Sequence, residues 1–246
     1  MDELKSEFKN DQYTFEDNER LLHSHGQNGP DEVFKVLYNK LQKFADLVFY
    51  VESDEDTEKL INLAIKHDVC LLPFGGGTNV TNALKLPKKE NRMIVSVDTR
   101  RLSKIESMDK KNLLVTVQAG ITGKSLEEQL QKEGYTVGHE PDSIELSTLG
   151  GWISTNAAGM KKNRYGNIED IVQNVTMITP NGIINQLKPL VRSSIGIKTQ
   201  NLLFGSEGNI GIITKATLRM HKLPEASDYE SVVLKDWDTG VKFMFE

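Results

Sequence analysis

The sequence predicts an α+β protein built from two lobes, and three observations lead to this prediction. Residues 47–72 alternate as strand, helix and strand, which is typical of a small α/β unit. Residues 172–187 favour two strands joined through Asn181-Gly182, a pair that supplies the positive φ of a tight hairpin. The chain has no internal repeat and no low-complexity linker. We therefore expect interlocked lobes over residues 31–100 and 101–222, a lead-in over residues 1–30 and a further segment over residues 223–246.

The first lobe is expected to alternate helices and strands. From Pro30 to Phe44, hydrophobic residues recur at spacings of three and four, which predicts a helix. Ser53 precedes a run of acidic residues, a pattern typical of a capped helix because carboxylates stabilise a helix N-terminus. The polar residues 1–29 show no sustained period and are interpreted as extended. Strands are predicted on either side of the second helix, over residues 47–51 and 69–72.

The rest of the chain is expected to contain mostly strands. Thr122 begins a predicted helix that runs to Lys132 and stops at Gly134, the residue type that most often ends a helix. Further strands are predicted over residues 93–97, 113–118, 172–178, 183–187 and 210–220.

The composition excludes several classes of protein. The 246 residues include 30 Lys and Arg against 35 Asp and Glu, and the net charge of −5 argues against nucleic-acid binding. No apolar run approaches the roughly 18 residues of a membrane-spanning helix. Cys70 stands alone, so no internal disulfide forms, and the first residues do not resemble a secretory signal. His23 and His25 lack a cluster of further ligands, so a polar turn is expected there and no metal site.

Three segments combine glycine with small hydroxyl residues: 73–79, 148–159 and 205–211. Glycine lets a backbone turn sharply and approach a ligand, and it exposes amide hydrogens that bind phosphate. Each segment alone is typical of a turn. Together they predict a binding site for one large phosphate-bearing cofactor.

Two familiar nucleotide-binding patterns fail in this sequence. Val80 stands where a Gly-x-Gly-x-x-Gly motif requires its third glycine, and Gln118 stands where a Walker A loop requires its first. His139 beside Glu140 and Asp142 could take part in acid–base chemistry, but the spacing alone favours a solvated loop over a catalytic group. The basic residues 161–165 are open to two interpretations, a phosphate contact or a solvated face.

Four motifs in order, residues 73–78, 138–143, 147–152 and 205–208, resemble the FAD-binding domain of the vanillyl-alcohol-oxidase (PCMH) type. The resemblance implies two α+β subdomains with an extended FAD between them. Some relatives tether the flavin through His or Cys near the first loop; residues 73–79 contain neither, so noncovalent FAD is expected. The resemblance assigns the cofactor contacts to Pro73, Phe74, Gly75, Gly76, Gly77, Thr78, Asn79, Asp142, Ser143, Ile144, Glu145, Leu146, Ser147, Thr148, Thr155, Asn156, Ala157, Ala158, Glu207, Gly208, Asn209, Ile210, Gly211, Ile212 and Ile213.

Within this superfamily the sequence most resembles the alkyldihydroxyacetonephosphate synthase family. Residues 20–26, 159–163 and 165–170 look like motifs of that family. Its members are transferases that replace the acyl chain of acyl-dihydroxyacetone phosphate by a long-chain fatty alcohol, with no net redox change. The resemblance therefore implies these two substrates and a role in ether-lipid synthesis.

The same resemblance places the family's catalytic residues in a C-terminal cap, of which residues 223–246 look like the opening. No catalytic residue is therefore assigned, and the chain alone is expected to be incomplete for catalysis. Residues 196–198 depart from the family pattern, because Lys198 stands where members carry an acid. The resemblance implies a peroxisomal location, although the chain shows no clear targeting signal. It also implies at most a peripheral contact with membranes, and it leaves a homodimer open.

Two alternatives of other kinds stay open. One is a redox FAD-dependent 2-hydroxy-acid dehydrogenase of the same fold, which residues 156–159 also resemble. The other is a noncatalytic flavin-binding module.

Overall fold

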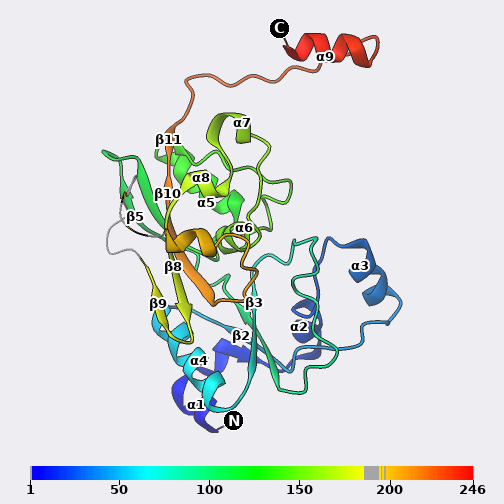
Figure 1. Cartoon of the computed structure of the whole chain (residues 1–246), viewed down its shortest axis with the longest axis vertical. Helices are drawn as coiled ribbons and strands as arrows, with labels where there is room; N and C mark the ends of the chain where they lie inside the picture. Colours follow the sequence, from blue (N-terminus) through cyan, green and yellow to red (C-terminus); the bar gives the residue numbers. More distant parts are fainter. Residues whose placement is uncertain (1, 186–193, 195, 197, 246) are drawn as a thin grey trace.

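The protein consists of two α+β lobes, which confirms the predicted fold class. The computed structural model describes residues 2–185, 194, 196 and 198–245. The first lobe, at the bottom of Figure 1, holds a four-stranded sheet, and the second lobe above it holds a five-stranded sheet. A small two-stranded sheet pairs β7 (Tyr135–Thr136) with β11 (His221–Lys222) in the second lobe.

The sheet of the first lobe has the order β1-β2-β4-β3. Its strands β2 (Leu47–Tyr50), β4 (Ile94–Asp98) and β3 (Cys70–Phe74) are parallel, and the predicted strands over residues 47–51, 69–72 and 93–97 are confirmed. Helix α4 (Asp54–Lys66) links β2 to β3. The hydroxyl of Ser53 accepts a hydrogen bond from the amide of Asp56 at 3.0 Å, so Ser53 caps α4 as predicted.

The N-terminal segment is folded, so the interpretation of residues 1–29 as extended is wrong. It forms α1 (Asp2–Glu7), the 3₁₀ turn η1 (Asn10–Gln12), β1 (Tyr13–Thr14) and α2 (Asp17–Leu22). Phe8 packs edge-on against Phe49 with ring centroids 4.7 Å apart, which places this segment in the first core. These elements are too short to produce a detectable hydrophobic period.

Helix α3 (Pro30–Leu37) is shorter than the pattern over residues 30–44 predicts. The helix ends at Leu37, and Asn39 adopts a left-handed conformation with φ 52° that breaks the helix. The helix also exposes most of its hydrophobic residues, so their spacing does not mark a buried face. In Figure 1, α3 lies at the outer edge of the first lobe.

The sheet of the second lobe is antiparallel with the order β5-β6-β10-β8-β9. The predicted strands are confirmed in β6 (Leu114–Gln118), β10 (Ile212–Arg219) and the hairpin of β8 (Val172–Thr179) with β9 (Gly182–Ile184), whose turn residue Gly182 has φ 122°. The end of the predicted strand over residues 183–187 lies outside the described residues, as do parts of the departure at residues 196–198. Strand β5 (Ile105–Asp109) is not predicted, because it is a largely polar edge strand.

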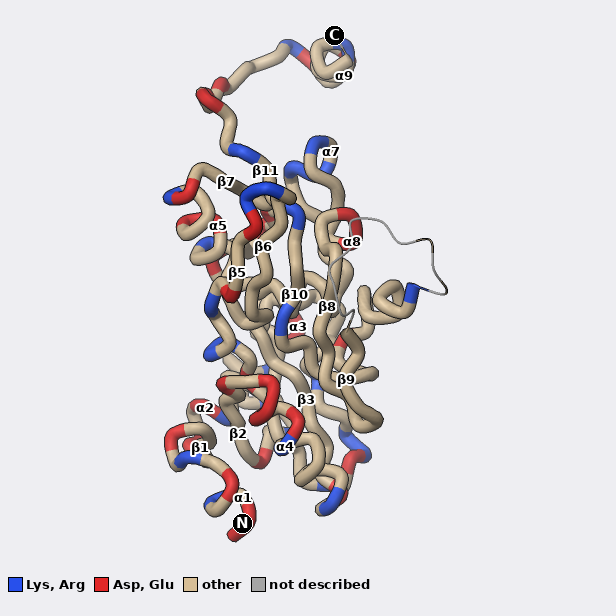
Figure 2. The backbone as a smooth tube through the Cα atoms, turned by 90° about the vertical axis from the view of Figure 1, so that its left-hand side faces the viewer, with Lys and Arg blue, Asp and Glu red and all other residues tan. Residues whose placement is uncertain are grey.

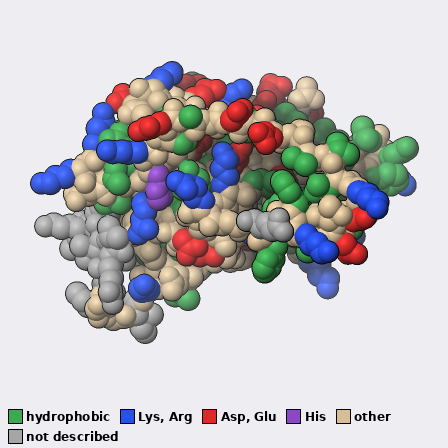
Figure 3. Space-filling view, turned by 90° about the horizontal axis from the view of Figure 1, so that it is seen from above, with side chains coloured by type: hydrophobic (Ala, Val, Ile, Leu, Met, Phe, Trp, Pro, Cys, Tyr) green, Lys and Arg blue, Asp and Glu red, His purple; other side chains and the backbone are tan. Residues whose placement is uncertain are grey.

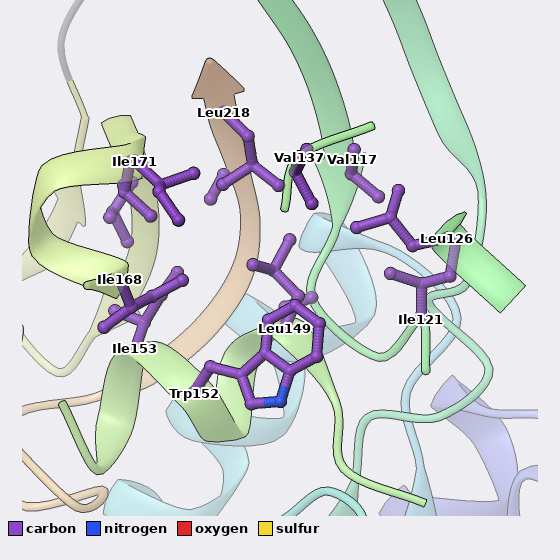
Figure 4. Packing of buried hydrophobic residues seen from close by; sticks show 14 of the residues in the cluster. Val117, Ile121, Leu126, Val137, Leu149, Trp152, Ile153, Ile168, Ile171 and Leu218 are labelled. Carbon is purple, nitrogen blue, oxygen red and sulfur yellow. The ribbon is translucent and has the colours of Figure 1, made fainter. Parts of the chain in front are cut away.

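Helices cover the second sheet and enclose its core. Helix α5 (Gly123–Lys132) is confirmed, with the hydroxyl of Thr122 accepting from the amide of Ser125 at 3.3 Å. Figure 4 shows Leu149, Trp152 and Ile153, from α6 (Leu149–Ser154), among the side chains that fill the core. The remaining short elements are α7 (Lys162–Tyr165), α8 (Ile168–Ile171) and the 3₁₀ turn η2 (Thr199–Leu202).

The C-terminal segment leaves the second lobe and ends in α9 (Trp237–Phe245), which stands apart at the top of Figures 1 and 2. Trp237 is 83% exposed and Phe245 is 94% exposed. Seen from this end, hydrophobic side chains gather on the right half of the molecule (Figure 3). In the part of the chain that the structure describes, none of the helices has the length and hydrophobicity of a membrane-spanning segment.

Candidate functional site

A cleft of about 370 Å³ lies where the two lobes meet, which is within the size range of small-molecule sites. The first lobe contributes the loop after β3 and Thr99 after β4. The second lobe contributes the turn before α6, the residues after α6 and the turn before β10. All three glycine-rich segments of the sequence therefore contribute to one cleft.

The glycine loop, residues 75–79, follows β3 directly and carries unpaired amide donors. The backbone N–H groups of Gly75, Gly76, Gly77 and Thr78 donate no hydrogen bond to any described residue. Neighbouring amides without protein acceptors form a binding site for an anion such as phosphate. The loop is held from its outer side, because the amide of Gln27 donates to the carbonyl of Gly77 at 2.7 Å.

The glycines of this loop allow it to touch the second lobe. A Cβ atom at Gly75 would lie 2.4 Å from the hydroxyl of Thr148, and one at Gly76 would lie 2.0 Å from the carbonyl oxygen of Leu146. Gly77 adopts φ 69°, a conformation that favours glycine. Glycine is therefore required here for packing between the lobes as well as for access to a ligand.

The second glycine-rich segment, residues 148–159, is not a loop along its whole length, because it begins with helix α6. The hydroxyl of Thr148 caps α6 by accepting from the amide of Gly151 at 3.3 Å. The carbonyl of Ser147 accepts from the amide of Gly123 at 3.1 Å, and the hydroxyl of Ser147 accepts from the indole of Trp152 at 2.8 Å. These bonds fix the wall of the cleft that the glycine loop faces.

The third segment is a strained turn packed on α6. Glu207 has φ 45° and Gly208 has φ 82°, and the amide of Glu207 donates to the carbonyl of Ser154 at 2.9 Å. A Cβ at Gly208 would lie 2.9 Å from Pro73, so this turn also touches the start of the first segment.

The structure brings most, but not all, of the predicted site residues to the cleft. The predicted residues that line it are Pro73, Phe74, Gly75, Gly76, Gly77, Thr78, Asn79, Ser143, Ser147, Thr148, Thr155, Asn156, Ala157, Ala158, Glu207, Gly208, Gly211, Ile212 and Ile213. The predicted residues that do not line it are Asp142, Ile144, Glu145, Leu146, Asn209 and Ile210.

Sequence reasoning missed other lining residues, which lie after the glycine loop, after β4, at Pro141 and in α6: Val80, Thr81, Ala83, Leu84, Thr99, Pro141, Gly150, Gly151, Trp152 and Ser154. Thr99 follows a parallel strand, as the glycine loop does. The carboxyl ends of parallel strands meet at one edge of a sheet, so the position of Thr99 directly after a predicted strand could have placed it beside the glycine loop.

His139 is a buried packing residue and does not line the cleft. It is 1% exposed, and its ring lies 4.7 Å from that of Trp152. Burial lowers the pKa of His139 to about 4, which keeps the ring neutral at pH 7. The interpretation as a solvated loop residue is therefore wrong.

The basic stretch 161–165 is tied down by an ion pair. Lys161 lies 2.5 Å from the carboxylate of Glu140, and this hydrogen bond raises the pKa of Lys161. None of residues 161–165 lines the cleft.

His23 and His25 lie in the turn that follows α2, as predicted, but this turn is buried rather than exposed to solvent. Both residues are buried, and His23 contacts Asp98 at 2.9 Å.

Unpaired loop amides in a cleft between two α+β lobes are typical of domains that bind a phosphate-bearing nucleotide cofactor. The chain belongs to the FAD-binding domain family, whose family model matches residues 45–188. The unpaired amides of the glycine loop fit the pyrophosphate of FAD.

Comparison with known proteins shows which members of this family the chain is similar to. The chain is 43% identical to the alkyldihydroxyacetonephosphate synthase of Caenorhabditis elegans over 92% of the chain and 38% of that protein. A solved structure of an alkyldihydroxyacetonephosphate synthase superposes with a TM-score of 0.86 and 36% identity, covering 92% of this chain and 40% of that one. The chain is also 30% identical to a mitochondrial D-lactate dehydrogenase (cytochrome) of Kluyveromyces lactis, over 96% of the chain and 40% of that protein. The chain thus spans about two fifths of the length of these relatives.

Proposed function

We propose that this chain binds FAD noncovalently and is the FAD-binding part of an alkyldihydroxyacetonephosphate synthase. The single observation that carries the proposal is the glycine loop, whose free amides line the cleft in a chain 43% identical to such a synthase. In the proposed complex the amides of Gly75 to Thr78 hold the pyrophosphate.

The cleft itself favours a noncovalent complex. Among the described residues that line it there is neither His nor Cys, the side chains that most readily tether a flavin. The bound flavin would supply an electrophilic ring system, and the protein's part is to position it and shield it from water. The walls built on Trp152 and Ile213 provide the apolar surface for that shielding.

The finer assignment rests on similarity to the synthases. We propose acyl-dihydroxyacetone phosphate and a long-chain fatty alcohol as the substrates of the whole enzyme, and the peroxisome as its location. Residues 31–222 form the proposed FAD-binding domain, with a boundary near residue 100 between its subdomains. Residues 223–246, with the exposed helix α9, would begin the cap that completes the active site.

The first experiment is an absorption spectrum of the purified chain before and after acid precipitation, together with its intact mass. Noncovalent FAD predicts two flavin bands that move to the supernatant and an intact mass without flavin. A colourless protein that takes up no added FAD would remove the proposal. The synthase assignment is then tested by joining the chain to a synthase cap, in cis or in trans, and measuring formation of the alkyl ether product.

A redox role is the second candidate, because the chain is 30% identical to a D-lactate dehydrogenase. The two candidates differ in one measurement: D-lactate or glycolate reduces and bleaches the flavin of a dehydrogenase, but leaves that of a synthase oxidised. A flavin that responds to neither substrate class, even with a cap supplied, would favour a noncatalytic module.

A further inference from the structure

An ion pair joins the two lobes behind the wall of the cleft that β10 forms. The ammonium group of Lys215, on β10 of the second sheet, lies 2.9 Å from a carboxylate oxygen of Asp54, the first residue of α4 in the first lobe. The same ammonium group lies 3.2 Å from the carboxylate of Glu106 on β5, so Lys215 bridges one acid from each lobe. No other ion pair among the described residues joins α4 to the second sheet.

The pair of Lys215 with Asp54 is partly shielded from water. The two side chains are 25% and 28% exposed. Burial by itself lowers the pKa of Lys215, but its hydrogen bonds to Asp54 and Glu106 raise this pKa by more, so the ammonium group stays charged. Opposite charges that are partly removed from water attract each other more strongly than exposed ones, and salt screens them less.

Apolar contacts beside this pair also connect the lobes. Ile178 of β8 and Ile212 of β10 belong to the core of the first lobe, in which Leu60 and Ile61 of α4 are also buried. Helix α4 packs against β8 and β10, and in Figure 1 it lies below the hairpin of β8 and β9. The ion pair therefore lies at the edge of a packed joint between α4 and β10.

Both sides of this joint lead directly to walls of the cleft. Gly211, Ile212 and Ile213 line the cleft, and Lys215 follows two residues later on the same strand. In the first lobe, α4 leads into β3, and the glycine loop follows β3. A shift of α4 on β10 would therefore move the glycine loop relative to the opposite wall. A ligand that contacts both walls needs them at a fixed separation.

We propose that Lys215 is a positioning residue for the cofactor: its ion pairs with Asp54 and Glu106 hold the glycine loop and the start of β10 at the separation that FAD requires. Lys215 does not line the cleft, so it acts on the cofactor only through the two lobes. This inference rests on the proposed function, because it takes FAD as the ligand of the cleft.

Reversal of the charge at residue 215 tests the proposal. In Lys215→Glu three carboxylates face one another, and their repulsion should move α4 away from β10. We expect this variant to bind FAD at least about tenfold more weakly than the unchanged chain in a fluorescence titration of the apoproteins. Lys215→Met removes the charge without adding repulsion, so it should weaken binding by a smaller factor of about three. This milder variant takes the place of Lys215→Glu if the latter does not fold.

Two further variants show whether the ion pair itself is responsible. In the double variant Asp54→Lys/Lys215→Glu the pair forms again with its charges exchanged, so most of the lost FAD affinity should return. Lys110→Glu is the matched control. Lys110 pairs with Glu133 at 2.8 Å, but both residues belong to the second lobe, so its reversal should leave FAD affinity unchanged.

Thermal unfolding of each variant, with no FAD and with one fixed FAD concentration, separates positioning from stability. A pair that only stabilises the fold lowers both midpoints and leaves the FAD affinity of the folded protein unchanged. A positioning pair also reduces the upward shift of the midpoint that FAD produces, because this shift depends on the dissociation constant.

Two results would overturn the role of Lys215. One is that Lys215→Glu and Lys215→Met both bind FAD as tightly as the unchanged chain. The other is that exchange of the charges in Asp54→Lys/Lys215→Glu restores none of the lost affinity. A different result, an unchanged chain that binds no FAD at all, would overturn the proposed function and this inference with it.

Discussion

His23 and Asp98 form a hydrogen-bonded pair inside the first lobe, with Nε2 of His23 2.9 Å from Oδ2 of Asp98 and each residue 1% exposed. Nδ1 of His23 donates to the carbonyl of Glu19 at 2.7 Å, so both ring nitrogens have oxygen partners. The His23 ring also lies 4.4 Å from that of Phe74, the last residue of β3. The pair therefore ties the N-terminal segment to the base of the glycine loop.

The variant His23→Ala should be strongly destabilised. It leaves the buried carboxylate of Asp98 without one of its partners, and breaking such a pair typically costs about 3–5 kcal/mol. Asp17→Ala is the matched control, because the pair of Asp17 with Arg20 is at the surface and contributes below about 1 kcal/mol. Urea unfolding at pH 7 measures both, and equal losses would show that the buried pair adds no more than a surface one.

The His23–Asp98 pair also predicts that the free energy of unfolding depends on pH under acidic conditions. Burial by itself raises the pKa of Asp98. The hydrogen bonds from His23 and Arg100 lower it by more, so the pKa of Asp98 lies below its ordinary value of 3.8. The folded state therefore keeps a charge that the unfolded state loses, and this stability is present above pH 3.8 and is lost as the pH falls below it. The difference in unfolding free energy between the unchanged chain and Asp98→Asn should shrink below pH 3.8. A constant difference down to pH 2 would contradict this assignment.

Gly76→Ala should reduce FAD affinity by at least about tenfold, because the new Cβ must displace the carbonyl of Leu146, 2.0 Å away, and with it the loop amides. Gly240→Ala is the control. Its Cβ would lie 3.7 Å from Leu234, an ordinary contact, so FAD affinity should not change. Fluorescence titration of the apoprotein with FAD gives both constants. Unchanged affinity in Gly76→Ala would remove this loop from the proposed site.

The sequence correctly predicted helix caps and a hairpin turn, which depend only on residues close together in the chain. The caps Ser53 and Thr122 and the hairpin turn at Gly182 are confirmed, because a cap or turn needs only neighbouring residues. The spacing over residues 30–44 correctly predicted a helix but not its end at Leu37, because the left-handed turn at Asn39 and the lack of a covering partner depend on the rest of the fold.

The candidate site was predictable in outline, since the glycine-rich segments all reach one cleft. Which way each residue faces was not predictable. The carbonyl of Leu146 faces Gly76, and Leu146 does not line the cleft. Thr99 lines the cleft because β4, which it follows, pairs in parallel with β3, which the glycine loop follows. Such contacts join residues far apart in sequence, and no local pattern records them.

Glu32→Ala should loosen the connection between α3 and the glycine loop. Glu32 holds the amide of Gly26, and the next amide, that of Gln27, holds the carbonyl of Gly77. Losing a buried acceptor costs about 1–3 kcal/mol, so amide hydrogen exchange over residues 24–37 should become faster. The exposed Glu55→Ala should leave that exchange unchanged. Protection equal to that of the unchanged chain in Glu32→Ala would show that other contacts hold α3.

His139 should make the protein less stable as the pH falls from 6.5 to 4. Its pKa is lowered by burial to about 4 in the folded state, against about 6.5 in an unfolded chain, so only the unfolded state takes up a proton across this window. The free energy of unfolding should fall by up to about 3 kcal/mol over the window and show no further loss from this group below it.

His139→Phe should remove this part of the pH dependence, because phenylalanine packs against Trp152 without a proton to bind. The comparison uses the slope of unfolding free energy against pH, so any constant cost of fitting the larger ring cancels. Ile65→Phe is the control, since Ile65 is exposed on α4 and its side chain does not titrate; it should keep the slope between pH 6.5 and 4. If His139→Phe keeps the same slope as the unchanged chain, another group is responsible for the loss of stability in acid.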